Sequence, residues 1–468
     1  MKQYGLEPTL TETDDIHGHV CGREGRGILD LIRIGRLTEY GRRLDVFMDV
    51  SSEKVIAIFG KRGQGKSYTL GSLIEGLVTE ESNSSISRLG NRRAVLLFDT
   101  LNIYQWMNVP LDSDTSSEYP EIQKQARVLE GWDVKPEKLK VKIWFPAGFP
   151  SDFDPGRHNE LLLRISDFSL EDWGLLLGLD TIRDIKGQLV AEVFMKVTNI
   201  GWDHHDGQHI PPNESYSVND MLDCLENDAD FQSGVYRNET LRAVRQQLLA
   251  FSRLPLFQGE GTALNELLEP GQVSVILLNR LSQDLRGVLV SVLIRRLLRE
   301  RSAASEATKD LMVNPNLCED NRQALLDFLK TAVPKTWVVV DEAQNVIPSE
   351  RRTSASESLV KLVKEGRNFG LSFVVTTQQP KALDRSVMSQ VETFIVHKLV
   401  SHNDIEYVFE NIKCPFPEGV KEDIRVLSSR DLLRDIDRGQ VVVSDTNSPR
   451  SFVMQVRPRV SVHGGFEA

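Results

Sequence analysis

The sequence is poor in cysteine, in long apolar runs and in net positive charge, and each shortage excludes a class of protein. Four cysteines, Cys21, Cys224, Cys318 and Cys414, are scattered over 468 residues, and no two of them form a CxxC pair. This spacing argues against a disulfide framework or a zinc ribbon and fits a reducing cytosol. A chain of this length can bury a full hydrophobic core without such cross-links.

No uncharged apolar stretch approaches the roughly 20 residues that a membrane helix needs. The best candidate, 288–298, is interrupted by Arg295 and Arg296. The N-terminus is polar and acidic, unlike a signal peptide. We therefore expect a cytoplasmic protein without a membrane partner.

The charge balance is acidic, with 56 Lys and Arg against 67 Asp and Glu and a net charge of −11. This balance excludes a protein that is cationic over its whole surface. It does not exclude DNA binding, because a ring or groove can concentrate Lys and Arg locally inside an acidic body. Hydrophobic residues at 40% and charged residues at 26% are typical of a globular protein.

Short apolar runs alternate with helical patterns along much of the chain. The run 54–59 stops at Gly60, residues 70–77 carry apolar side chains at helical spacing, and a second run covers 94–98. Strand, glycine loop, helix and strand make a βαβ unit. Further strands are predicted at 46–50, 141–145, 273–278, 337–340, 373–376, 394–397, 441–443 and 452–456. This alternation predicts an α/β fold with a central, mainly parallel sheet.

Between about 158 and 255 the strand candidates vanish and helical spacing dominates, interrupted by a polar stretch at 202–217. Residues 107–138 are expected to form a loop, and 302–334 are mixed and polar. We therefore divide the chain into a short N-terminal β-rich segment (1–45), a first core part (46–150), a helical insertion (151–265) and a second core part with C-terminal strands (266–468).

The strongest chemical signal is GKRGQGKS at 60–67, which fits GxxxxGK[ST] between a predicted strand and a predicted helix. Its glycines let backbone N–H groups surround a β-phosphate, and the helix N-terminus adds partial positive charge. Lys66 is expected to reach the β- and γ-phosphates, and the Ser67 hydroxyl to bind Mg²⁺. The predicted nucleotide-binding residues are Gly60, Arg62, Gly63, Gln64, Gly65, Lys66, Ser67 and Tyr68.

A second signal is the apolar run 337–340, which ends at Asp341 and Glu342. At a strand end beside a P-loop, Asp341 is expected to hold the metal through water, and Glu342 to act as the general base for the attacking water. A strand that ends in two solvated acids is the plain alternative. The tandem of two acids favours an ATPase over a small-molecule kinase.

Two further positions follow these acids. Gln378 stands just beyond the predicted strand 373–376, where its amide can contact the γ-phosphate or its water. Arg367 lies in a turn, EGRNFG, that can project it away from its own core. An arginine supplied by a neighbouring subunit accelerates phosphoryl transfer by about 10³–10⁵. A solvated surface cation is the alternative interpretation of Arg367.

The runs GKRGQGKSYTLG, DEAQNVIP, EGRNFG and TTQQP occur in this order, and together they resemble the HerA family of hexameric ATPases, in the HerA/FtsK branch of RecA-like motors. The C-terminal VRPRVSVHGG (456–465) is also similar to that family. The resemblance implies a RecA-like core in a homohexamer that hydrolyses ATP with Mg²⁺ and moves double-stranded DNA through its channel. It places Lys66, Ser67, Asp341, Glu342 and Gln378 in cis and Arg367 in trans.

Family members work with nucleases in DNA end resection, and relatives work with nuclease or sirtuin-type effectors in anti-phage defence. A partner effector is therefore expected. Three departures from the family pattern are visible: the segment before the P-loop is short, Ile103 replaces an acid after the second strand, and Gln379 replaces an arginine. The short leading segment favours a partner other than the usual nuclease.

Other candidates carry weaker signals. The histidine-rich run 202–209 suggests either a metal site or a solvated loop, and the loop is favoured. Arg295, Arg296, Arg299 and Arg301 either line a DNA channel or form a solvated helix face. Lys381 and Arg385 contact DNA phosphates or pair with nearby acids. Arg457 and Arg459 are interpreted as surface cations, with contact to a neighbour's nucleotide as the alternative.

Two other functions compete with the translocase. One is a ring scaffold whose nucleotide state regulates a bound effector with little translocation, which the short N-terminal segment and the acidity favour. The other is a monomeric P-loop enzyme for a small molecule, for which no clear substrate pocket is apparent in the sequence.

Overall fold

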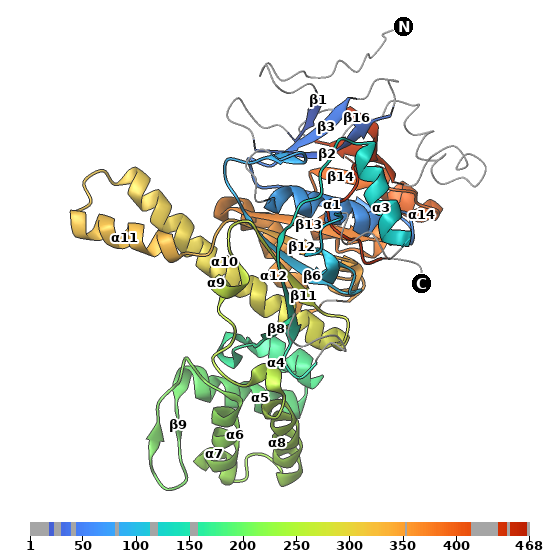
Figure 1. Cartoon of the computed structure of the whole chain (residues 1–468). Helices are drawn as coiled ribbons and strands as arrows, with labels where there is room; N and C mark the ends of the chain where they lie inside the picture. The colour runs from blue at the N-terminus through green and yellow to red at the C-terminus, as the bar shows by residue number, and fades with distance from the viewer. Residues whose placement is uncertain are drawn as a thin grey trace.

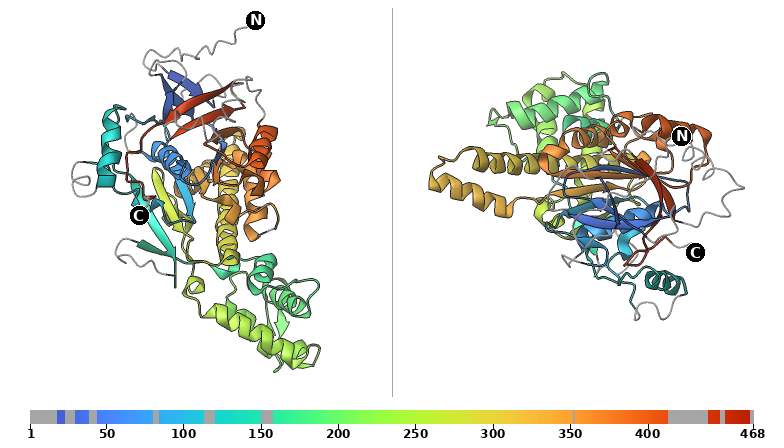
Figure 2. Two further views of the ribbon diagram at one scale, coloured as in Figure 1. Left: turned by 90° about the vertical axis from the view of Figure 1, so that its right-hand side faces the viewer. Right: turned by 90° about the horizontal axis from the view of Figure 1, so that it is seen from above.

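The computed structural model describes residues 18–22, 30–38, 44–79, 84–112, 120–149, 158–351, 353–412, 439–446 and 450–465. A twisted sheet with helices on both faces forms the main body (Figure 1). A helical block extends below this body, and a two-helix arm projects to one side (Figures 1 and 2). The predicted α/β class with a mainly parallel central sheet is confirmed.

The described strands of the body form one 14-stranded sheet. Its parallel part places the P-loop strand β4 near the middle. The order is β14 (Thr393–Val396), β4 (Val55–Phe59), β13 (Leu371–Thr377), β12 (Thr336–Val340), β6 (Ala94–Asp99), β11 (Gln272–Leu277), β7 (Lys140–Pro146) and β8 (His158–Leu161). β6, β11 and β12 are buried throughout, so these strands are nearly continuously apolar instead of alternating.

The remaining strands extend this sheet on the β14 side. β15 (Gln440–Asp445), β16 (Arg450–Val456), β2 (Leu31–Leu37) and β3 (Asp45–Asp49) are antiparallel in succession. β1 (Gly18–Cys21) pairs with β3, and β5 (Ser87–Arg88) pairs with β2. The β segment that precedes the P-loop is therefore continuous with the nucleotide-binding sheet.

Helices cover the two faces of the sheet separately. α1 (Lys66–Val78) packs on one face, where its apolar residues join Ile56, Val95 and Val339. α10 (Gln283–Val313) and α12 (Ser354–Glu365) pack on the other face against Ala57 and Leu96. Because adjacent strand residues point to opposite faces, each strand supplies both cores.

The helical block contains α4 (Leu170–Leu177), α5 (Ile185–Met195), α6 (Val218–Asn227), α7 (Ala229–Gln232), α8 (Asn238–Ser252) and α9 (Leu264–Leu267), with a small hairpin of β9 (Trp202–Asp203) and β10 (His209–Ile210). Capping boxes begin α4 at Ser169 and α6 at Ser217. The proposed boundaries at 151 and 265 stay a prediction. β8 was not expected within 158–255, and it belongs to the core sheet.

Two segments that the sequence pattern assigned to loop or left without a structure are helical. α3 (Pro120–Glu130) lies inside 107–138, and α11 (Glu319–Thr331) lies inside 302–334. α3 buries Leu129 alone, and α11 buries no residue. Leu325, Leu326, Phe328 and Leu329 of α11 do recur at helical spacing, but this signal is short and stands in an otherwise polar segment. The described chain also has α13 (Arg385–Met388) and α14 (His402–Asn411), and none of its helices is long and apolar enough to span a bilayer.

Arg457 and Arg459 are fully buried, so the prediction that they are surface cations is wrong. Both pair with the buried Glu75 on α1, each at 3.0 Å, and Ser461 donates its hydroxyl hydrogen to Glu75 at 2.6 Å. A Cβ on Gly71 would lie 2.6 Å from the Arg459 guanidinium, which explains the glycine there. These contacts clamp the C-terminal segment onto the helix that follows the P-loop.

Glu75→Ala is expected to destabilise the protein by about 3–5 kcal/mol, because two guanidinium groups lose their buried counterion. Burial alone would raise the pKa of Glu75, but Arg459 and Arg457 hold that pKa below its usual value. The stabilisation is therefore present above the unfolded pKa of about 4.3 and is lost as the pH falls through the lower folded pKa. Urea unfolding at pH 7 and pH 3 measures both effects.

The matched control is Glu121→Ala on α3, whose carboxylate is exposed and only 3.8 Å from Lys124. Its free energy of unfolding should stay within about 0.5 kcal/mol of the wild-type value, as for ordinary surface substitutions. Equal unfolding midpoints for the two variants at pH 7 would contradict the clamp.

Candidate nucleotide site

The P-loop connects β4 to α1 through residues 60–65. Gly63 and Gly65 have φ values of 76° and 102°, a region in which only glycine is unstrained. A Cβ on Gly60 would lie 2.5 Å from the Cβ of His397. Backbone conformation at two positions and close packing at a third therefore require the glycines of the motif.

His397 and Lys398, which follow β14, support this loop. The Lys61 N–H donates to the Lys398 carbonyl and the His397 N–H to the Phe59 carbonyl, both at 2.7 Å. The His397 ring lies 2.9 Å from the Thr69 hydroxyl of α1. Burial lowers the pKa of His397 to about 3, so the ring is neutral near pH 7. The sequence analysis missed this histidine, because nothing in its local pattern marks it.

Lys66 faces the second motif across the sheet edge. Its Nζ lies 3.6 Å from the Glu342 carboxylate, and both side chains are buried. Burial lowers the pKa of Lys66, although Glu342 and Asp341 oppose the shift. Glu342 also accepts hydrogen bonds from Gln378 at 2.6 Å and Gln344 at 2.7 Å. The structure thus brings together three residues that the sequence placed in the site, Lys66, Glu342 and Gln378.

Asp341 lies deeper, at the end of β12. The Thr376 hydroxyl donates to its Oδ1 at 2.5 Å and accepts from the Glu342 N–H at 3.0 Å. Glu342 has φ 48°, a strained backbone conformation for a residue with this side chain. Burial, and then the neighbouring Asp99, raise the pKa of Asp341 to about 7. A nearby positive charge would therefore stabilise the ionised form of Asp341.

Asp99 and Tyr104 belong to this site, and the sequence analysis did not place them there. β6 pairs in parallel with β12 so that Phe98 is opposite Val340, which sets Asp99 beside Asp341. Burial raises the pKa of Asp99 to about 6, and its carboxylate accepts from the Tyr104 N–H at 2.9 Å. Tyr104 lies beside Ser67, and burial raises its pKa well above the usual value. Two apolar runs that each end in Asp were the available signal.

These acids fit a divalent cation. Oδ2 of Asp341 is buried without a hydrogen-bond partner, and Asp99 adds a second carboxylate next to it. Carboxylate and hydroxyl oxygens are the ligands that Mg²⁺ prefers. Ser67 lies in the first turn of α1 with its side chain beside Tyr104. The chain thus offers the oxygen donors that the sequence assigned to the metal, Ser67 and Asp341, with Asp99 nearby.

Arg367 lies at the opposite edge of the sheet from this site. It belongs to the 3-10 turn Gly366–Phe369, which precedes β13, whereas Gln378 follows the same strand. Seven strand residues at about 3.3 Å each separate the two ends by roughly 20 Å. The Arg367 side chain is 56% exposed and lies 3.6 Å from Glu392. The arginine therefore does not meet the P-loop of its own chain.

Arg62 and Tyr68, two of the predicted nucleotide-binding residues, lie outside the group of contacts around Lys66, and the role of Arg62 stays a prediction. The Arg62 side chain is exposed on the P-loop. The Tyr68 hydroxyl accepts from the Arg459 N–H at 2.9 Å, and its ring packs edge-on against His463. Tyr68 thus contacts the C-terminal segment, and its role in nucleotide binding stays a prediction.

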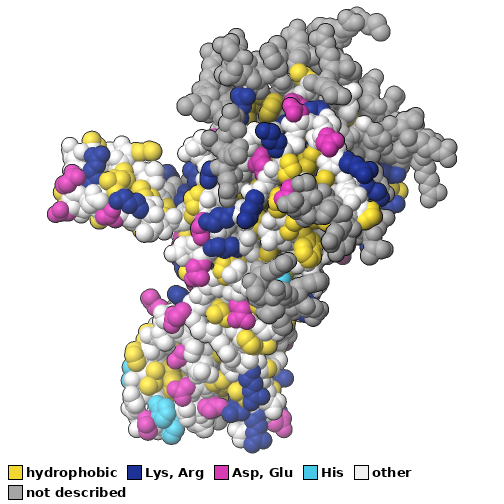
Figure 3. All heavy atoms as spheres, in the orientation of Figure 1, with side chains coloured by type: hydrophobic (Ala, Val, Ile, Leu, Met, Phe, Trp, Pro, Cys, Tyr) yellow, Lys and Arg dark blue, Asp and Glu magenta, His cyan; other side chains and the backbone are white. Residues whose placement is uncertain are grey.

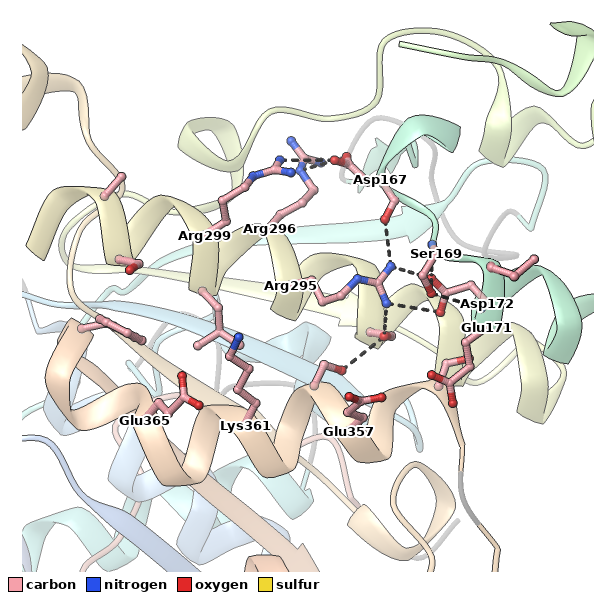
Figure 4. Close-up of a pocket in the computed structure, with 18 of the residues that line it drawn as sticks. Asp167, Ser169, Glu171, Asp172, Arg295, Arg296, Arg299, Glu357, Lys361 and Glu365 are labelled. Carbon is pink, nitrogen blue, oxygen red and sulfur yellow. Dashed lines mark hydrogen bonds and ion pairs between the residues drawn. The ribbon is translucent and has the colours of Figure 1, made fainter. Parts of the chain in front are cut away.

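Three arginines of α10, Arg295, Arg296 and Arg299, connect the core to the helical block. Arg295 pairs with the buried Asp172 at 2.5 Å, while Arg296 and Arg299 both approach Asp167 at 3.3 Å. They line a pocket of about 860 Å³ between α10, α12 and the start of α4 (Figure 4). Since α4 belongs to the block, these pairs fix its orientation on α10. The sequence analysis expected these arginines either to line a DNA channel or to form a solvated helix face. Neither expectation included ion pairs with the helical block.

The histidine-rich run forms the β9–β10 hairpin. His209 pairs with Asp203 at 2.6 Å, and His204 pairs with Asp206 at 2.7 Å. Among the residues that the structure describes, no three His, Cys, Asp or Glu side chains are arranged to hold a metal ion.

Comparison with known families agrees with this geometry. The sequence model described as "Helicase HerA, central domain" matches residues 32–297, more than half of the chain. The chain belongs to the HerA helicase family. The match includes the P-loop, the strand that ends at Asp99, the helical block and most of the buried part of α10.

Two curated relatives align over most of this HerA-family chain. The DNA double-strand break repair helicase HerA of Saccharolobus solfataricus is 24% identical over 420 residues, which cover 88% of this chain and 66% of the relative. A probable helicase of Methanocaldococcus jannaschii is 22% identical over 393 residues, or 81% of this chain and 59% of the relative. The chain thus spans less than two thirds of the length of these relatives.

A solved structure shares the fold. VirB4 of Thermoanaerobacter pseudethanolicus superposes with a TM-score of 0.50 at 14% identity, covering 93% of this chain and 97% of VirB4. At this identity the likeness concerns the arrangement of the elements and nothing further.

Proposed function

We propose that this protein is an ATP-hydrolysing DNA translocase or helicase of the HerA type. In this proposal it acts as a homohexamer on double-stranded DNA, with a partner nuclease or another effector in DNA processing or anti-phage defence. The observation that carries the proposal is that the predicted catalytic residues lie at two opposite edges of the sheet. Lys66, Asp341, Glu342 and Gln378 converge at one edge of the sheet, while Arg367 lies at the other edge. The relatives that carry the name helicase support the DNA-directed part.

The buried carboxylate of Glu342 is the proposed general base. Gln378 and Gln344 each donate a hydrogen bond to one of its oxygens, which fixes the orientation of the carboxylate. Lys66, now 3.6 Å from Glu342, is expected to turn to the phosphates when ATP binds. Gln378 is then placed to orient the attacking water toward the base.

Ser67 and Asp341 are the proposed Mg²⁺ ligands, Asp341 through water. When bound, Mg²⁺ supplies positive charge that polarises the phosphate oxygens. The Thr376 hydroxyl holds Asp341 in place at 2.5 Å. Asp99 adds a second carboxylate beside Asp341, which supports cation binding at this point.

The position of Arg367 supports the proposed ring. The side chain is exposed and far from its own P-loop, so it can complete a nucleotide site only on another copy of the chain. Repetition of that contact around a closed ring gives each subunit one complete site. A monomeric P-loop enzyme gives Arg367 no catalytic role.

ATP hydrolysis is expected to rise when linear double-stranded DNA is added, and the stimulation should fall steeply with salt. Phosphate contacts release counterions, so the DNA affinity should drop by about tenfold or more between 50 and 200 mM salt. Hydrolysis rates at increasing KCl, with and without DNA, measure this effect. The rate without DNA serves as the control and should change little.

Hydrolysis that ignores DNA at every salt concentration, yet changes the activity of a bound effector, would favour the ring scaffold instead. The continuity of the N-terminal strands with the nucleotide-binding sheet is the observation that supports this second function. The identity of the effector and the cytoplasmic location stay predictions.

A further inference from the structure

α10 and α11 form an arm that leaves the body of the protein. α10 has 31 residues, so it is about 46 Å long at 1.5 Å per residue. Its last buried residue is Ala307, and beyond it the helix continues outward to Val313 (Figures 1 and 2). α11 then returns alongside it. We call residues 308–331 the arm.

The arm exposes large apolar side chains. Met312 and Val313 near its tip are 78% and 74% exposed, and Leu326 and Phe328 on α11 are also exposed. Hydrophobic atoms are visible on the surface of the arm in Figure 3. Grouped apolar residues on a projecting element mark an interaction surface more often than single exposed ones.

α11 is poorly supported by its own chain. It has 13 residues, and none of them is buried. Helices of this length are marginal in water without tertiary packing. Leu325 and Leu329 are half-buried, which leaves Leu326 and Phe328 for another surface. The arm therefore has more apolar surface than α10 covers.

The base of the arm is fixed to the turn that carries Arg367. Arg301 of α10 donates from Nε to the Phe369 carbonyl at 2.8 Å, and Ser305 donates to the Asn368 carbonyl at 2.9 Å. Arg301 also donates to the carbonyl of Val333, beyond α11, at 2.7 Å. The arm and Arg367 thus leave the body from one hydrogen-bonded unit.

We propose that the arm docks on the adjacent copy of this chain, in the same interface that Arg367 enters. The inference rests on the proposed ring, since Arg367 can complete a nucleotide site only on a neighbour. An arm rooted in the same turn continues that interface outward. It adds apolar contact to an interface in which Arg367 alone supplies little binding energy.

Charge complementarity points to the same occupant. The first turn of α11, at the arm tip, carries Glu319 and Asp320. The P-loop edge of the chain, which the neighbour presents to Arg367, exposes Lys61, Arg62 and Arg280. Opposite charges across an interface speed association and fix its register.

Cross-linking from the arm tip tests where the arm lies. Cys318 at the start of α11 is exposed, whereas Cys21 and Cys224 are buried. The full chain with Cys414→Ser is labelled at Cys318 with a benzophenone maleimide and irradiated with Mg²⁺ and a non-hydrolysable ATP analogue. Covalent dimers of the chain are expected. A matched variant, Cys318→Ser with Ile182→Cys on the exposed end of the helical block, should give far fewer dimers.

Substitution of the exposed apolar residues provides a second test. Leu326→Asp with Phe328→Asp leaves the core untouched and is expected to weaken subunit association by about tenfold or more. Ile182→Asp with Ile185→Asp is the control, with two exposed isoleucines on the helical block that are more exposed than Leu326 and Phe328. Sedimentation over a range of protein concentrations measures both.

The outcomes distinguish a failure of the arm proposal from a failure of the proposed ring. If the wild-type chain stays a single subunit with ATP and Mg²⁺, the proposed function fails. If the wild-type chain assembles, but Cys318 gives no chain-to-chain adduct and the arm variant assembles equally well, the ring stands and the arm proposal is overturned.

Discussion

Arg367→Ala is expected to reduce ATP hydrolysis by about 10³–10⁵ while leaving ATP affinity nearly unchanged. The arginine lies roughly 20 Å from its own P-loop, a length set by the seven residues of β13. It therefore adds nothing to binding by the same chain. In the proposed ring it is expected to stabilise the phosphoryl transition state in a neighbouring subunit, which would change the hydrolysis rate alone. Steady-state hydrolysis and binding of a fluorescent ATP analogue separate the two quantities.

The matched control for this substitution is Lys364→Ala, which removes an exposed cation from the last turn of α12. Its hydrolysis rate should equal that of the wild type. Mixed assemblies provide the decisive comparison. An Arg367→Ala chain keeps an intact P-loop and a Lys66→Ala chain keeps an intact arginine, so mixing the two inactive chains should restore part of the activity. If no ratio of the two restores any hydrolysis, Arg367 does not act in trans.

Glu342→Gln is expected to bind ATP with Mg²⁺ and to hydrolyse it about 10²–10⁴ times more slowly. The amide keeps the shape of the carboxylate and one acceptor for the hydrogen bonds from Gln378 and Gln344, but it cannot accept a proton from water. Loss of the negative charge also frees Lys66, whose Nζ lies 3.6 Å away. The ATP complex should therefore accumulate. A single-turnover measurement with radiolabelled ATP records both the bound and the hydrolysed fraction.

Glu350→Gln is the control for Glu342→Gln, because Glu350 is exposed and eight positions further along the same connection. Its single-turnover rate should match the wild type. A Glu342→Gln protein that hydrolyses ATP at the wild-type rate would show that another group activates the water, and Asp99 would then be the first residue to examine.

The parallel core was predictable because its signals are local. Short apolar runs that end at Gly60, Asp99 and Asp341 are what fully buried strands look like in sequence, and the structure has a strand at each of them. The P-loop adds a requirement for glycine at fixed positions, which any chain with this turn must meet. Because Asp341 and Glu342 follow a predicted strand directly, the sequence also predicted that they lie beside the P-loop.

The remaining features depend on contacts between distant segments. His397 supports the P-loop because β14 is next to β4, an adjacency that no local pattern announces. Arg457 and Arg459 read as surface cations until Glu75, nearly four hundred positions earlier, is seen between them. α11 carries Leu325, Leu326, Phe328 and Leu329 at helical spacing, but this short signal stands in a mixed, polar segment and was overlooked. For His397, Arg457 and Arg459, partners distant in sequence decided the outcome.

The Glu75 clamp also has a mechanical consequence. Arg457 and Arg459, in the segment that follows β16, hold α1 through Glu75, and a Cβ on Gly76 of α1 would lie 3.0 Å from Ile32 of β2. A shift of α1 during ATP hydrolysis is therefore expected to displace both β2 and the segment after β16. We therefore expect a partner bound near β2 or near the segment after β16 to change position together with α1.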